Sequence, residues 1–159
     1  MSDVDTRRAT QRRLATVMLV EAALFVLFWG AWFVDNDLVA TDTSPEYQAF
    51  EEAFPLPDSL VVVCLVLGAY GLLRDRRWSV CFVMWASGAI VFLGLVDLAY
   101  DVQNGMWGWH PDGLGRIAVV TGLLASGLGF GHWGWRQVTE PTRVRARDAA
   151  LARTGSDES

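Results

Sequence analysis

The sequence predicts an all-α integral membrane protein, folded as a bundle of four helices. The chain of 159 residues is 52% hydrophobic, which is more apolar than a soluble domain of this size. Its apolar residues form four nearly continuous blocks, whereas a soluble fold would alternate them with polar positions. Each block of about 18 to 23 residues can cross the ~30 Å hydrocarbon layer as a helix, the conformation that satisfies its own backbone amides.

Arginine residues indicate how this predicted bundle is oriented. All 13 basic residues are Arg, and all but Arg116 lie before the first block, in the turn at 74–77 or after the last block. The positive-inside rule places these three segments in the cytoplasm. We therefore expect an up-down-up-down bundle with both termini cytoplasmic. The absence of Lys from an Ala-, Gly- and Val-rich chain is typical of a GC-rich bacterial genome, which suggests a bacterial inner membrane.

The first helix is predicted at about 11–34. Its apolar run is too long for a secretion signal, and acidic residues follow where small residues would mark a cleavage site, so we expect it to be retained. Glu21 is its one charge at membrane depth. The acidic loop that follows contains a helix signal, because Thr43 or Ser44 can cap a helix that starts at Pro45. Aromatic residues then recur along one side, which predicts a short amphipathic helix on the outer membrane surface.

The second and third helices are predicted at about 57–74 and 78–100, joined by a very short arginine-rich turn into an antiparallel hairpin. Asp58 stands where a capping residue would stabilise the start of the second helix, and capping is the interpretation we favour over an exposed acid at an entrance. Small residues at Gly68, Gly71 and Gly94 predict close approach of neighbouring helices.

The fourth helix is predicted at about 116–136. Its small residues Gly122, Ser126 and Gly129 recur at helical spacing, so we expect a second stripe of close packing. The four helices make one domain, residues 1–137. Residues 138–159 are polar and rich in Arg, and we expect a largely disordered cytoplasmic tail in which a short basic helix can form on anionic lipid.

Ionisable residues within the apolar blocks are the first candidates for chemistry, because a charge in the hydrocarbon layer is costly. Glu21 and His132 lie at similar predicted depths, and the first and last helices of such a bundle are neighbours. A Glu–His pair there could pass a proton or orient a ligand. The alternative is that His132 reaches water and that Glu21 is neutral and bonded to a packed neighbour.

An acidic cluster at the outer side is the second candidate. Carboxylates at one mouth could attract a cation, but the spacing is not that of an EF-hand loop, and we favour a solvated acidic face with hydrogen bonds at helix ends. The members of this cluster are Asp35, Asp58, Asp97, Asp101 and His110. We predict no metal site from it.

The sequence contains no motif that assigns a reaction. A phosphate-binding loop, Cys-x-x-Cys, His-x-x-x-His and Gly-x-Ser-x-Gly are all missing, so we name no catalytic residue and no cofactor. The leading hypothesis is a non-enzymatic bundle that binds membrane lipid, a second copy of itself or another membrane protein. Proton-coupled transport or membrane-embedded catalysis through Glu21 and His132 is the alternative. The acidic outer face argues against nucleic acid as a partner.

Overall fold

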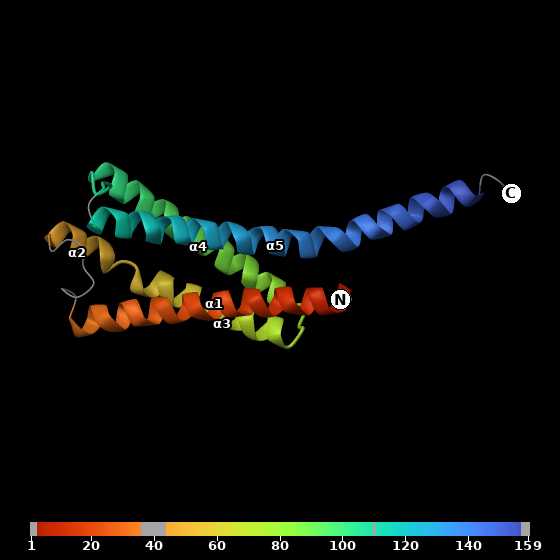
Figure 1. Cartoon of the computed structure of the whole chain (residues 1–159), viewed down its shortest axis with the longest axis horizontal. Helices are drawn as coiled ribbons and strands as arrows, with labels where there is room; N and C mark the ends of the chain where they lie inside the picture. The colour runs from red at the N-terminus through yellow and green to blue at the C-terminus, as the bar shows by residue number, and fades with distance from the viewer. Residues whose placement is uncertain (1–2, 36–43, 110, 157–159) are drawn as a thin grey trace.

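The computed structural model describes residues 3–35, 44–109 and 111–156, with side chains for 5–35, 44–109 and 113–139. Every regular element in these residues is an α-helix (Figure 1). Four segments are long and apolar enough to cross a membrane, so the all-helical prediction is confirmed for the described part of the chain. The helices are α1 (Asp3–Val34), α2 (Pro45–Glu51), α3 (Pro55–Leu73), α4 (Ser79–Gln103) and α5 (Pro111–Ser156).

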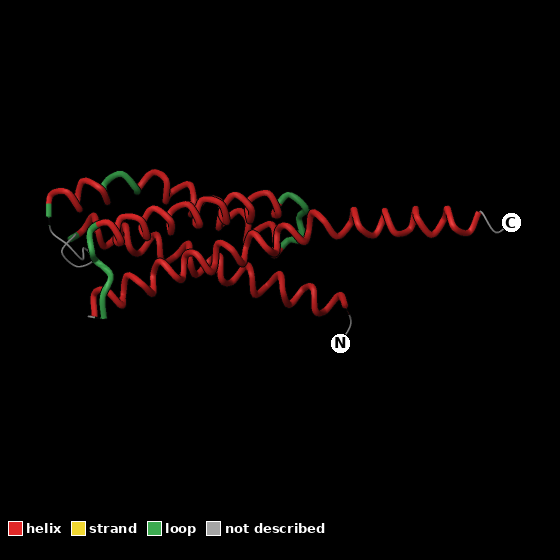
Figure 2. The backbone as a smooth tube through the Cα atoms, turned by 90° about the horizontal axis from the view of Figure 1, so that it is seen from above, coloured by secondary structure: helices red, strands yellow, loops and turns green. Residues whose placement is uncertain are grey.

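Two of the long helices exceed their predicted bounds. α1 begins at Asp3 and not near residue 11, and Thr10 Oγ1 donates a hydrogen bond to the Thr6 carbonyl in this polar first part. α5 continues past residue 136 to Ser156, so the backbone of the predicted disordered tail is helical as far as that residue. Figure 2 shows this part of α5 extending beyond the other helices.

The four long helices pack in the order in which they follow one another in the chain. The close pairs are α1 with α3, α3 with α4, and α4 with α5. α1 and α5 are not among the closely packed pairs, although the sequence predicted the first and last helices to be neighbours. α2 and the connection from α4 to α5 lie at one end of the molecule, and the turn between α3 and α4 lies towards the other (Figure 1).

The main hydrophobic core surrounds α3 and α4. Its fully buried side chains recur at spacings of three and four residues along each helix, which is the pattern of one buried helical face. Met18 from α1, Leu65 from α3, Ile90 from α4 and Phe130 from α5 are among the largest of them. A second cluster at the end near α2 holds Trp29, Trp32 and Tyr47.

Glycines bring α4 and α5 into close contact. A Cβ atom at Gly127 would lie 2.8 Å from Val91 Cγ2, and one at Gly131 would lie 2.7 Å from Ser87 Oγ. Gly134 continues this stripe against Met84. The Ser87 hydroxyl donates a buried 2.7 Å hydrogen bond to the Gly127 carbonyl across the interface. Small residues and interhelical hydrogen bonds of this kind hold helices together in lipid, where apolar surface alone gives little preference for a neighbouring helix.

The predicted small-residue positions divide into two groups. Gly68 packs against Met18 of α1 and Val83 of α4, Gly71 packs against Ser79, and Gly94 packs against Leu124 of α5. By contrast, a Cβ atom at Gly122 or Gly129 would have no other atom within 4 Å. Two of the three positions predicted on the fourth helix are therefore open, whereas Ser126 contacts Glu21 of α1. The close approach of α5 to α4 uses Gly127, Gly131 and Gly134 instead.

Helix ends follow recognisable local rules. The Ser44 hydroxyl accepts a hydrogen bond from the Tyr47 backbone N–H at the start of α2, where Pro45 is the first residue, as predicted. α3 ends with Asp75 at a φ of 50°, and the Arg76 N–H bonds back to the Gly71 carbonyl at 2.8 Å. This is a Schellman motif, which needs a left-handed residue after the helix. Gly105 gives α4 the same kind of ending, at a φ of 64°.

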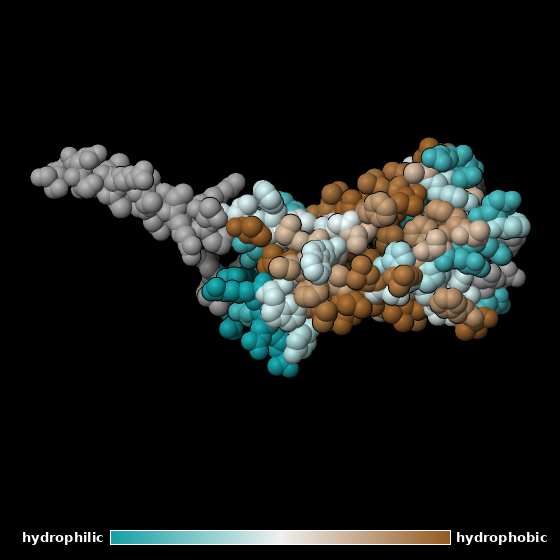
Figure 3. All heavy atoms as spheres, turned by 180° about the vertical axis from the view of Figure 1, so that it is seen from behind, coloured by the Kyte–Doolittle hydropathy of each residue, from teal (hydrophilic) through white to brown (hydrophobic). Residues whose placement is uncertain are grey.

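Apolar side chains cover the middle of the molecular surface. Figure 3 shows a brown apolar zone between hydrophilic groups at the two ends of the bundle. Large side chains such as Leu27 on α1, Phe92 on α4 and Leu128 on α5 are exposed within it. Cys81 is exposed and Cys64 is buried, and both are free thiols.

Replacing Gly127 by Val should destabilise the contact between α4 and α5. The new side chain would meet Val91 and the nearby Ser87 carbonyl, and overpacking of this kind costs about 1 to 3 kcal/mol. Unfolding of the purified protein in mild detergent, followed by circular dichroism, measures the loss. Gly129→Val is the matched control, because that position on the same helix is open. Equal losses for the two variants would contradict this description of the interface.

Candidate functional site

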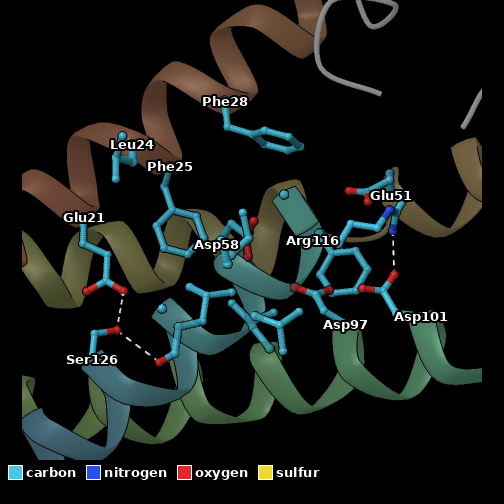
Figure 4. A pocket seen from close by; sticks show the side chains of 18 of the residues that line it. Glu21, Leu24, Phe25, Phe28, Glu51, Asp58, Asp97, Asp101, Arg116 and Ser126 are labelled. Carbon is cyan, nitrogen blue, oxygen red and sulfur yellow. Dashed lines mark hydrogen bonds and ion pairs between the residues drawn. The ribbon is translucent and has the colours of Figure 1, made fainter. Parts of the chain in front are cut away.

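A cavity of about 890 Å³ lies between α1 and α5. It occupies the space left because these two helices do not pack closely against each other. Residues of α3 and α4 also line it, and α2 contributes Tyr47, Phe50 and Glu51 at one end. Most of its wall is apolar, but five carboxyl groups and one guanidinium group face it (Figure 4). A mostly apolar cavity of this size with a few polar groups is typical of a small-molecule site.

Glu21 and Ser126 join the two sides of this cavity. The Ser126 hydroxyl donates to Glu21 Oε1 at 2.8 Å and also lies 3.1 Å from the Leu123 carbonyl of its own helix. Glu21 is buried, and its second oxygen, Oε2, has no hydrogen-bond partner. Figure 4 shows the bonded pair at the end of the cavity away from α2. This bond is the polar link from α1 to α5 within the cavity wall.

Asp58 bonds to an indole and does not cap α3. Trp29 Nε1 of α1 donates to Asp58 Oδ2 at 2.8 Å, in a buried position. The residue before α3 is Phe54, which makes no side-chain capping bond. Asp58 is therefore not a side-chain cap, although it is an acidic residue in the first turn of α3, the other form of the favoured interpretation. Pro55 and Pro57 explain why α3 needs no such cap, since proline in the first turn has no N–H to satisfy.

Asp101 and Arg116 form an ion pair at the end of the cavity near α2. Arg116 Nη1 lies 2.6 Å from Asp101 Oδ1, and both side chains are largely buried. Trp107 Nε1 donates to the other Asp101 oxygen at 3.3 Å. The Arg116 guanidinium also lies 5.2 Å from the centre of the Tyr47 ring, within the range of a cation–π interaction. These contacts connect the end of α4 to the start of α5 and to α2.

Asp97 lies one helical turn before Asp101 and faces the same cavity. Among the described residues it has no hydrogen-bond or ion-pair partner. Glu51 of α2 faces the cavity from the opposite side (Figure 4). Because Arg116 is engaged by Asp101, these two carboxyl groups have no cation bonded to them in the described structure.

The predicted candidates are partly brought together. The cavity is lined by Glu21 together with Asp58, Asp97 and Asp101. The sequence predicts Glu21 in a different site from the other three. Asp35 is exposed at the end of α1 and does not line it. His110 lies outside the described residues.

His132 is exposed, and the partner of Glu21 is Ser126 instead. Ser126 was predicted only as a packing residue, and Glu51 and Arg116 were not predicted as site residues. The isolated position of Arg116, as the one Arg outside the three segments that are predicted to be cytoplasmic, is a usable signal for a buried ion pair. No group of three or more His, Cys, Asp and Glu side chains in the described residues is arranged to hold a metal ion.

Comparison of the chain with protein-family models, with curated proteins and with solved structures finds no match.

Removing Arg116 should destabilise the protein more than removing the whole ion pair. Arg116→Gln leaves Asp101 as a buried carboxylate without a cation, which costs about 3 to 5 kcal/mol for a buried pair. Adding Asp101→Asn to that variant should restore much of the stability, because the remaining groups are neutral. Thermal unfolding of the two single variants and the double variant measures this coupling. Strictly additive losses would show that the two side chains act independently.

Proposed function

We propose that this chain is a multi-pass protein of a bacterial inner membrane, with four spans and both termini in the cytoplasm. The support is the distribution of Arg, which marks the N-terminus, the turn after α3 and the C-terminal part of α5. Arg116, the exception, is engaged in an ion pair with Asp101. Its charge is therefore balanced on the outer side, and it does not weigh against this orientation.

Accessibility to an impermeant thiol reagent tests this orientation. In a variant whose two native cysteines are replaced by Ala, we expect Glu52→Cys to react in intact cells. Arg76→Cys should react only after the membrane is permeabilised, because the turn after α3 is predicted to be cytoplasmic. The reverse pattern of labelling would invert the proposed topology.

We further propose that the protein binds one lipid-like amphiphilic molecule in the cavity between α1 and α5. The observation that carries this proposal is the exposure of the apolar residues along both edges. Val20 and Leu24 on α1, and Val119 and Gly122 on α5, line the cavity and are also exposed on the outer surface. In a membrane these edges face the hydrocarbon layer, so an alkyl chain can enter sideways.

The carboxyl groups of the cavity are concentrated at its end near α2. Its acidic residues near α2 include Asp58, Asp97 and Asp101, and the apolar edges of α1 and α5 continue from there towards Glu21 (Figure 4). An amphiphile fits this arrangement with its polar group near α2 and its tail between α1 and α5. The Ser126 hydroxyl and the Glu21 carboxylate are paired in this wall, but the pair joins α1 to α5 and most of the lining is apolar, so binding is better supported than catalysis.

Proton-coupled transport is a second proposal, and Glu21 is the observation that favours it. An ionisable residue with an unbonded oxygen at membrane depth is a common feature of proton pathways. The role first assigned to His132 is less well supported, because that side chain is exposed. Glu21→Gln tests this proposal. If the variant still binds the amphiphile but loses its uptake into vesicles driven by a pH gradient, transport is supported over simple binding.

Blocking the cavity edge should abolish retention of an amphiphile. Gly122 lines the cavity and has open space beside it, so Gly122→Leu places an alkyl side chain in the proposed entrance. Native mass spectrometry of protein released from mild detergent should detect one retained amphiphile on the unmodified chain and none on this variant.

Gly129→Leu is the matched control, since Gly129 is equally open, lies on the same helix and does not line the cavity. It should retain the bound molecule. An unmodified chain that carries no adduct, or equal loss from both variants, would refute binding in this cavity. Detection of a dimer without a bound small molecule would instead indicate that the open glycines form a surface for helix association.

A further inference from the structure

The cavity wall has more carboxyl groups than cationic groups. Its lining includes Glu21, Glu51, Asp58, Asp97 and Asp101 but a single cation, Arg116. The ion pair with Asp101 accounts for that cation. The other four carboxyl groups therefore face the cavity with no cation bonded to them in the described structure.

Two of these carboxyl groups are buried and incompletely bonded. Asp58 is 6% exposed and Glu21 is 9% exposed, and each has one oxygen with no hydrogen-bond partner, Oδ1 and Oε2 respectively. Both side chains line the cavity and extend into it in Figure 4. A buried acceptor without a donor is unfavourable, so these two oxygens show that the cavity wall is incompletely bonded in the described structure.

Aromatic rings surround the acidic end. Phe28, Tyr47, Phe50, Phe54 and Tyr100 all line the cavity. Two of them, Phe50 and Tyr100, stack with ring centres 4.1 Å apart. Aromatic faces attract cations, and a set of rings next to carboxylates suits an ammonium group that carries methyl or methylene substituents.

We propose that the occupant is a single-tailed amphiphile with a positively charged ammonium headgroup. The headgroup lies between Asp58, Asp97 and Glu51 against the aromatic rings, and the tail leaves between α1 and α5. This inference rests on the proposed amphiphile site and specifies its ligand class. A bilayer phospholipid fits less well, because its phosphate would meet these carboxyl groups. A neutral amphiphile would leave them without a countercharge.

Asp97 is the residue that best tests the charge requirement. It has no bond within the described structure to lose, so Asp97→Asn removes a charge and preserves shape. Glu52→Gln is the matched control, because Glu52 adjoins the cavity residue Glu51 in sequence but is exposed and does not line the cavity. Both variants change the net charge of the chain by the same amount, so a general surface-charge effect would move them together.

The experiment measures binding of three labelled probes of equal chain length to the full chain in phosphatidylcholine nanodiscs, with empty nanodiscs subtracted. The probes are dodecyltrimethylammonium, dodecanol and dodecyl sulfate. We expect tight saturable binding of the ammonium probe alone. Asp97→Asn should weaken it roughly tenfold or more, the change that about 1.4 kcal/mol produces, while Glu52→Gln should leave it unchanged.

Two results would overturn the inference: dodecanol binding as tightly as the ammonium probe, or equal effects of Asp97→Asn and Glu52→Gln. If Asp97→Asn does not fold, Asp58→Asn carries the test, since the amide oxygen can still accept from Trp29. If all three probes bind equally and Gly122→Leu abolishes their binding, the proposed amphiphile site is supported and only its charge selectivity is rejected. Absence of binding by every probe, together with no retained adduct, would reject both.

Discussion

Serial packing of the long helices is the constraint on which the rest of the structure depends. α3 contacts α1 on one side and α4 on the other, and α5 contacts α4. Gly127, Gly131 and Gly134 allow α5 to lie close against α4. α5 does not also pack closely against α1. The cavity follows from this geometry, and its side walls are the faces of α1 and α5 that would meet in a closed bundle.

Electrostatic contacts then define the two ends of the cavity. At one end, Arg116 joins Asp101 and lies over the Tyr47 ring, so α2, α4 and α5 meet at one cation. At the other end, the Ser126 hydroxyl reaches across to Glu21. An interhelical hydrogen bond in a membrane contributes about 0.6 kcal/mol on average. The Glu21 contact is therefore too weak to hold α1 and α5 together against the packing of their other faces, and it fixes a local separation only.

The sequence predicts the helices well because each depends on local information. Apolar blocks identify the four long helices, and Ser44 with Pro45 predicts the start of α2. The site was harder to predict because it depends on which face each helix turns inward. α5 carries two small-residue stripes, one through Gly122 and Gly129 and one through Gly127 and Gly134, about 140° apart at ~100° per residue. Composition and spacing are alike in both, so only the packed structure identifies the stripe that contacts α4 and the one that borders the cavity.

Asp58 illustrates the same limit for polar residues. Its position in the first turn of a helix is typical of a dipole-stabilising acid, yet its hydrogen bond goes to Trp29, 29 positions earlier in the chain. That bond fixes one carboxylate oxygen and leaves the other buried without a partner, in a residue that lines the cavity. Glu21 is arranged in the same way, with one oxygen bonded to Ser126 and one unbonded. At ~1.5 Å rise per residue, Glu21 lies about 12 Å along α1 from Trp29, the residue that bonds Asp58. An ammonium headgroup held near Asp58 is therefore too far from Glu21 to neutralise it, and the contact of Glu21 with Ser126 stays separate from the headgroup site.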